Sequence, residues 1–135
     1  MNNGKIFSLP VRVYFQDTDA GGVVYHASYL NFMERTRTEW LRSYGYSNAG
    51  LMKEFGMVFV VRSVKLDYLK PALLDDLLDV TAQIKDIGRS RISLVQSVRR
   101  SEEVLTEAEI HLVCVSLENF RPVGVPEVLL EQWKN

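Results

Sequence analysis

Alternation of apolar and polar side chains is the dominant pattern along this chain, and it predicts five strands. The clearest case is 77–87, where Leu78, Val80 and Ala82 share one face and polar residues fill the other. Two breaks in the pattern, at Pro71 and around Gly88, separate neighbouring strands. The predicted strands cover 6–16, 57–70, 77–87, 91–100 and 104–117.

Between the first two strands, apolar residues recur at spacings of three and four, which predicts a helix over 29–44. This helix of about four turns is too apolar for the surface, and Gly45 is a suitable stop signal. Its apolar residues are Tyr29, Leu30, Phe32, Met33, Trp40, Leu41 and Tyr44. A shorter helix is expected over 47–55 with Ser47 as its N-cap, and another after Pro126.

The order of these elements predicts an α+β fold. Short connections favour antiparallel neighbours, so we expect a curved, mostly antiparallel five-stranded sheet wrapped around one long apolar helix. The length of 135 residues fits a single domain, 1–135. One face of the sheet would cover the helix, which leaves the other face and an edge for a partner subunit.

Composition narrows the classes of function. The formal net charge of −1 gives no electrostatic reason to expect nucleic acid as a partner. One cysteine excludes an intrachain disulfide, and with only two histidines a zinc site is not expected. We find no secretory signal and no apolar stretch long enough to insert into a membrane, so a cytoplasmic location is the plain expectation.

Candidate catalytic residues are concentrated in the segment just before the long helix. Asp17 and Asp19 precede Gly21 and Gly22, and the helix begins between His26 and Tyr29. A carboxylate beside unpaired helix N-terminal amides provides a base or nucleophile together with a donor for a carbonyl oxygen. Such a pair suits thioester hydrolysis, because a thiolate leaves readily. A simple turn capped by aspartates explains the same residues, and the spacing alone does not decide between the two.

Residues 11–41, VRVYFQDTDAGGVVYHASYLNFMERTRTEWL, closely resemble the opening of the 4-hydroxybenzoyl-CoA thioesterase family of hotdog-fold proteins. More narrowly, they resemble its YbgC group of Tol-Pal-associated acyl-CoA thioesterases. The signature runs without gaps from Asp19 through Gly22 to His26. The segments FVVRSVKLDYLKPALLDD, GRSR and EAEIHLVCV extend the resemblance over 8–125.

The resemblance implies roles for individual residues. Asp19 occupies the position of the catalytic carboxylate, and the backbone N–H of His26 occupies the position that polarises the carbonyl. Asp17 is a secondary position that shapes the loop or raises the proton affinity of Asp19. Gly22 and Tyr25 would line the acyl pocket. Members of the family form homodimers through strand pairing, often as dimers of dimers, with active sites at the subunit junction.

Three cations at loop or strand-end positions, Lys70, Arg89 and Arg91, are candidates for binding the phosphates of coenzyme A. A solvated charged surface explains them almost as well. The expected substrate is an acyl-CoA, or an acyl carrier protein thioester, and no cofactor is expected beyond the coenzyme A of the substrate. The expected assembly is a homodimer or homotetramer.

Five residues carry other groups that could take part in chemistry. For the His26 side chain we favour a hydrogen-bonded positioning role, and for His111 a half-buried or interface position. Cys114 shares a face with apolar residues and is expected in the core. Glu34 and Glu39 are expected on the helix surface or paired with arginine. A 3-hydroxyacyl thioester dehydratase using His26 and Glu34, or a non-catalytic acyl-binding protein, are the competing functions.

Overall fold

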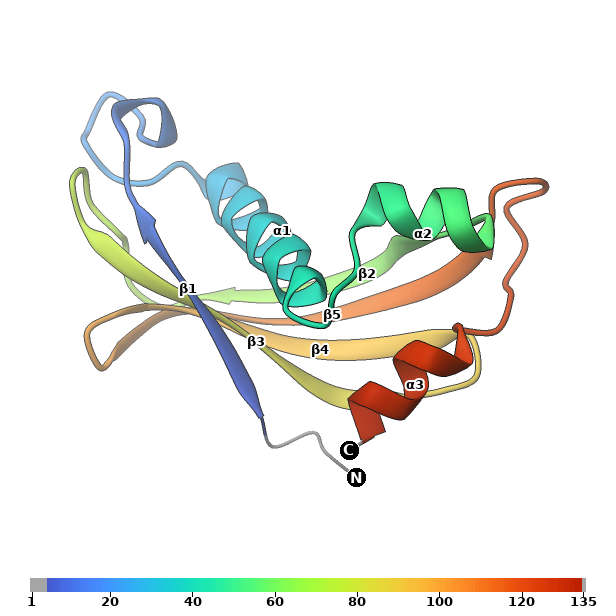
Figure 1. Cartoon of the computed structure of the whole chain (residues 1–135). Coiled ribbons are helices and arrows are strands. Elements are labelled where there is room, and N and C mark those ends of the chain that lie inside the picture. The colour runs from blue at the N-terminus through green and yellow to red at the C-terminus, as the bar shows by residue number, and fades with distance from the viewer. Residues whose placement is uncertain (1–4, 135) are drawn as a thin grey trace.

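The computed structural model describes residues 5–134, which form one antiparallel sheet and three α-helices (Figure 1). The strand order is β1-β3-β4-β5-β2, so β1 and β2 are the two edges. All four pairings are antiparallel. The strands are β1 (Ile6–Arg12), β2 (Met57–Tyr68), β3 (Leu77–Ile87), β4 (Arg91–Arg100) and β5 (Glu103–Ser116).

The long helix α1 (His26–Arg42) crosses one face of the curved sheet, and α2 (Asn48–Phe55) lies beyond its end over β2 (Figure 1). One stripe of α1 is buried, including Tyr29, Phe32 and Met33, and it meets the inward residues of the strands. The inward residues of β3 are those that the alternation predicted. Burial of this apolar stripe is the main force that holds the helix on the sheet. The α+β class and the sheet wrapped around one helix are as predicted.

Two element boundaries differ from the sequence prediction. The first strand ends at Arg12, not at residue 16, because Phe15–Asp17 forms a single 3-10 turn, η1, that leads the chain away from the sheet. The helix α1 begins at His26, at the early limit of the expected range, since Tyr25 keeps an extended backbone and acts as its N-cap. Ser47 caps α2 as predicted, its hydroxyl accepting from the Gly50 amide at 3.0 Å.

The last helix, α3 (Glu127–Lys134), follows Pro126 as the sequence predicts and is anchored by Trp133. That indole is fully buried and stacks on Trp40 of α1, with ring centroids 5.3 Å apart. Tyr44 and Phe59 complete the aromatic cluster. The indole nitrogen of Trp133 has no hydrogen-bond partner among the described residues, so its contribution is packing alone.

Replacing Trp133 with alanine should lower the free energy of unfolding by about 3–5 kcal/mol, since a large buried side chain would be lost and a cavity left. Trp133→Phe should cost less than half as much, because it keeps a ring and removes the unpaired N–H. Val128→Ala on the exposed side of the same helix serves as the control. Urea unfolding measures all three, and an alanine variant as stable as the parent would contradict this role.

Candidate active site

The loop between β1 and α1 folds back on itself and presents Asp19 at its turn. Thr18 and Val24 form an antiparallel bridge, and the Asp19 amide donates to the Val23 carbonyl at 3.0 Å. The Gly22 amide returns to the Asp19 carbonyl at 3.1 Å. Gly22 has φ of +81°, a backbone conformation that glycine adopts without strain. The glycine therefore makes the turn possible that holds Asp19 in place.

The two aspartates of the motif have different surroundings. The Asp17 carboxylate accepts from the Tyr14 amide at 2.8 Å and so closes the η1 turn. The Asp19 carboxylate is exposed, and its Oδ1 accepts from the Gly21 amide at 2.9 Å. The local turn bonding expected of an aspartate is thus present at both positions. This turn bonding occupies only one carboxylate oxygen of Asp19, and the other oxygen remains available to react with a substrate or water.

The helix α1 begins beside this loop, and no side chain caps its N-terminus. Tyr25, the N-cap, has φ of −67° and ψ of 141°, and its own amide donates to the Asp17 carbonyl at 2.9 Å. The side chain of Tyr25 is exposed. Within the described part of the chain, the amide of His26 has no acceptor. An unpaired amide at the positive end of a helix can accept the oxygen of a carbonyl or an oxyanion.

The His26 ring lies against the end of β2. It stacks on Tyr68 with centroids 4.4 Å apart, and the Tyr68 hydroxyl donates to the His26 carbonyl at 3.2 Å. The stack on Tyr68 positions the imidazole, and a hydrogen bond of the ring stays a prediction. His26, Tyr29 and Tyr68 line a cavity of about 210 Å³. Its other walls are Val23, Val24, Leu69, Lys70 and Pro71, and Asp19 is not among them.

The segment 71–76 fixes the loop and the helix start together. The Val24 amide donates to the Ala72 carbonyl at 2.9 Å, and the Leu74 amide to the Gly22 carbonyl at 3.0 Å. From the helix, the buried Tyr29 hydroxyl accepts from the Ala72 amide at 2.9 Å. Burial raises the pKa of Tyr29, so this hydroxyl stays neutral. One strip of backbone thus sets the distance between the Asp19 turn and the first turn of α1.

Ion pairs support that segment from the sheet. Arg100 joins Asp76 at 2.8 Å and Glu103 at 2.9 Å. Glu103 in turn accepts from Lys70 at 2.6 Å. The hydrogen bonds from Lys70 and Arg100 lower the pKa of Glu103, which therefore stays charged at neutral pH. Lys70 lies at the cavity as expected, with its ammonium already joined to one carboxylate.

Arg89 and Arg91 do not reach this cavity within one chain. They flank the yellow turn between β3 and β4, whereas the blue loop before α1 lies at the other end of the sheet (Figure 1). The length of β3, eleven residues, separates the two ends by about 33 Å. Within one chain these arginines therefore do not share a pocket mouth with Lys70, because an antiparallel hairpin carries them to the opposite end, and their binding of coenzyme A phosphates stays a prediction.

The remaining candidates lie away from the loop. His111 faces the outer side of the sheet, bonded to Ser93 at 2.8 Å and to Glu109 at 2.9 Å, and is half-buried as expected. Cys114 is fully buried, and burial raises its pKa to about 11, as befits a core residue. Glu39 pairs with Arg42 at 2.7 Å on the helix surface, as expected. Glu34 is exposed on α1, two turns after His26.

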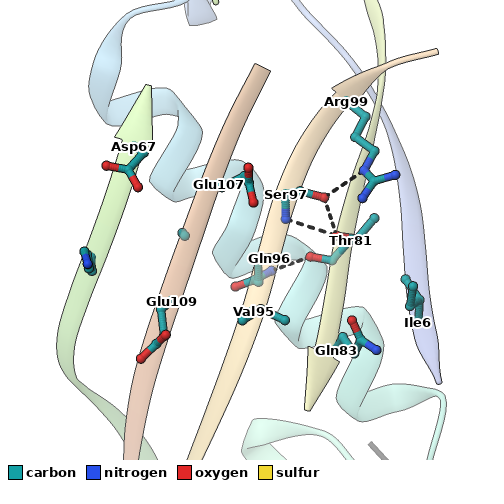
Figure 2. A pocket seen from close by; sticks show the side chains of 12 residues that line it. Ile6, Asp67, Thr81, Gln83, Val95, Gln96, Ser97, Arg99, Glu107 and Glu109 are labelled. Carbon is teal, nitrogen blue, oxygen red and sulfur yellow. Dashed lines mark hydrogen bonds between the residues drawn. The ribbon is translucent and has the colours of Figure 1, made fainter. Parts of the chain in front are cut away.

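A second hollow lies on the face of the sheet away from α1 and holds none of the predicted site residues. It has a volume of about 390 Å³ and a polar lining that includes Thr81, Ser97 and Arg99, which are hydrogen-bonded to one another (Figure 2). Among residues 5–134, no group of three or more His, Cys, Asp or Glu side chains is placed to hold a metal ion. No helix in that range could span a membrane.

Some residues that build the site were not identified from the sequence. Tyr68 lies within the strand predicted over 57–70, and its aromatic ring near the end of that strand is a signal that could have marked it as a wall of a binding cavity. Ala72, Asp76 and Arg100 have no local signal, since the contacts by which they build the site join residues at least 24 positions apart in the sequence. The arrangement combines an exposed carboxylate, an unpaired amide and an aromatic-lined cavity, which together suit attack on a bound carbonyl carbon.

Known proteins share this sequence and fold. Residues 13–133 match the model of the Thioesterase-like superfamily. Acyl-CoA thioesterase YbgC of Haemophilus influenzae is 43% identical, covering 94% of this chain and 92% of its own. Acyl-CoA thioester hydrolase YbgC of Escherichia coli O157:H7 is 42% identical, covering 98% of both.

The fold has a close match among solved structures as well. The crystal structure of a probable thioesterase from Bartonella henselae superposes with a TM-score of 0.87 at 34% identity, covering 90% of this chain and 100% of that one. The sheet wrapped around a single helix therefore has independent support. The chain therefore belongs to the thioesterase-like, hotdog-fold superfamily and, within it, to the YbgC group.

Proposed function

We propose that this protein is an acyl-CoA thioesterase that hydrolyses the thioester bond to a free carboxylic acid and a free thiol. Asp19 would attack the carbonyl carbon or activate water to do so, and the His26 amide would polarise the carbonyl oxygen. The observation that carries the proposal is the uncapped amide of His26, held beside the Asp19 turn by one segment of backbone. The relatives named acyl-CoA thioesterase support the substrate class.

Polarisation by the helix start is the electrostatic part of the mechanism. Negative charge develops on the carbonyl oxygen as the tetrahedral intermediate forms, and a donor fixed in advance stabilises it without reorganisation. The amide of His26 is fixed because Tyr25 on one side and Ser28 on the other are held by backbone hydrogen bonds. The imidazole would not need to transfer a proton, and its stack on Tyr68 shapes the cavity wall instead.

Asp19 would supply the second part by one of two routes. As a general base it takes a proton from water, the hydroxide adds to the carbonyl carbon, and the thiolate leaves and is protonated from solvent. As a nucleophile it forms an acyl anhydride with loss of the thiolate, and water then cleaves that anhydride. Both routes need the oxygen of Asp19 that is not bonded to the Gly21 amide. Neither requires a cofactor beyond the coenzyme A, or the acyl carrier protein, that carries the acyl group.

A dehydratase is less well supported by this geometry. Its acid–base pair would be His26 and Glu34, which lie eight residues apart on α1, a rise of about 12 Å. Within one chain the two groups therefore cannot act on adjacent carbons of one substrate. The imidazole also faces Tyr68 in place of a carboxylate. Thioester hydrolysis by Asp19 needs no such pair.

A second copy of the chain would complete the site. The edge strand β2 is twelve residues long and exposes Val60, Val61 and Val64. Long apolar edge strands are rarely left unpaired, because they template association. Antiparallel pairing of two β2 strands would bring the end of one sheet that carries Arg89 and Arg91 towards the site end of the other. The two arginines could then bind coenzyme A phosphates beside the partner's Asp19 loop.

Asp19→Asn should lower kcat/KM for acyl-CoA hydrolysis by about 10²–10⁴-fold, since the base or nucleophile is lost. The asparagine carbonyl can still accept from the Gly21 amide, so the melting temperature should change little. Asp86→Asn, at an exposed position on β3, is the matched control. Release of thiol from a panel of acyl-CoAs measures the effect, and full activity in the Asp19 variant would sink the assignment.

His26→Pro should lower kcat by about 10²–10³-fold, because it removes the proposed carbonyl donor. Proline is well tolerated at the first position of a helix, and the extended backbone of Tyr25 suits a following proline. His26→Ala loses the imidazole but keeps the amide, so it should lose far less activity. The same thiol-release assay compares the pair. Equal losses in the two variants would show that the ring, not the amide, carries the effect.

The protein should sediment as a homodimer or homotetramer at micromolar concentration. Val60→Asp, which places a charge on the exposed edge of β2, should shift it towards monomer and reduce hydrolysis in parallel. Analytical ultracentrifugation gives the mass, and Val128→Asp on the exposed face of α3 controls for added charge. A parent protein that is monomeric and fully active would contradict the shared site.

A further inference from the structure

A small cavity lies on the flank of α1 that faces β2. Its volume is about 110 Å³, and the sheet side of its wall is formed by Phe59, Val61 and Leu112. The helix side includes Glu34, Arg37 and Thr38, with Trp40, Leu41 and Asn48 completing the lining. It does not share a lining residue with the cavity at His26. The two hollows nevertheless involve the same two elements, α1 and β2.

An exposed apolar strip connects the two hollows. On α1, His26, Leu30 and Glu34 follow at intervals of four residues, so they lie on one face of the helix. On β2, Val61 lines the distal cavity and Tyr68 the proximal one, and Val64 stands between them opposite the buried Ile110. Leu30 is 42% exposed and Val64 40% exposed. An acyl chain whose carbonyl rests on the His26 amide would lie along Leu30 and Val64 towards the distal cavity.

Arg37 blocks the far end of that strip with a charged group. It is half-buried, and its Nη1 donates to Gln96 Oε1 at 2.9 Å. Gln96 is itself fixed, since its Nε2 donates to the carbonyls of Met33 and Thr81 at 3.1 Å each; the second bond is drawn in Figure 2. No carboxylate of the described residues lies within 4.0 Å of the guanidinium. Burial lowers the pKa of Arg37, while the nearby charge of Glu34 opposes that effect.

Contact with the Arg37 guanidinium is unfavourable for an alkyl chain. A guanidinium has five N–H donors, and one of them is used by Gln96 here. Methylene groups pushed against it would remove water from the remaining donors and offer no acceptor in return. The penalty would fall on the end of the acyl chain only, because Leu30 and Val64 before it are apolar and Glu34 lies at the same distal cavity as Arg37.

The rise of α1 gives the length of acyl chain that would reach Arg37. Glu34 and Arg37 lie eight and eleven residues after His26. The corresponding rises along α1 are about 12 and 16 Å, lengths spanned by an extended alkyl chain of roughly ten to thirteen carbons.

We infer that Arg37, held by Gln96, is the residue that limits acyl chain length, so that the enzyme accepts short and medium acyl groups of up to about ten carbons and discriminates against longer ones. The inference rests on the proposed thioesterase activity and adds a specificity determinant to it. Arg37 touches the distal end of the acyl group and takes no part in bond cleavage.

The test compares kcat/KM for butyryl-, octanoyl- and dodecanoyl-CoA in the parent protein and in Arg37→Met. Methionine keeps an unbranched, flexible apolar stem and removes the charged guanidinium group. The ratio of dodecanoyl to butyryl kcat/KM should rise tenfold or more in Arg37→Met. Arg35→Met, at an exposed position two residues earlier on the same helix, should keep the parent's ratio.

A second variant tests the path if Arg37→Met does not fold. Leu30→Trp places a bulky indole ring on the exposed strip, one turn before Glu34. Because the ring would obstruct the path of the acyl chain, the ratio of octanoyl to butyryl kcat/KM should fall tenfold or more. An unchanged ratio in Leu30→Trp, or an unchanged dodecanoyl ratio in Arg37→Met, would overturn the inference while leaving the thioesterase assignment intact. A parent protein that hydrolyses none of the three thioesters would overturn both.

Discussion

The structure depends on the backbone segment from residue 71 to residue 76, which holds the Asp19 turn and the first turn of α1 together. Hydrophobic burial places the helix on the sheet, but it does not fix where the helix starts relative to the loop. The backbone bonds of Ala72 and Leu74 do that, with the Tyr29 hydroxyl as the link to the helix. Arg100 and its carboxylate partners support the segment from the sheet side. A carboxylate and an unpaired amide are thereby kept at one end of the molecule.

Much of the fold could be predicted from the sequence because it is encoded locally. The alternation in β3 and the spacing of Tyr29, Phe32 and Met33 fix which side chains are buried, and burial then dictates the layers. Ser47 capped its helix because capping is a contact between near neighbours. The strand predicted to run on to residue 16 failed at η1, since Val13, Tyr14 and Phe15 are residue types that favour strands, whereas the hydrogen bond from the Tyr14 amide to the Asp17 carboxylate closes a 3-10 turn.

The candidate site was predictable only in part, for the same reason. Asp19, Gly22 and His26 lie in one continuous motif, and the structure brings them to one loop. The arginines after β3 could not be placed from their charge, because which end of a sheet a residue occupies depends on the topology of the whole chain. Arg37 is a similar case. On the helix it is one polar residue among several, and only its hydrogen bond to Gln96 of β4 shows that it faces the sheet.

The central claim is that the amide at the start of α1 polarises the thioester carbonyl, and isotope-edited infrared spectroscopy tests it most directly. An acyl-CoA carrying a ¹³C carbonyl would be bound to the inactive Asp19→Asn protein and to the same protein with His26→Pro added. The account predicts that the carbonyl stretch moves to lower frequency on binding to the first protein and stays close to its value in water in the second. An equal downward shift in both proteins would contradict it.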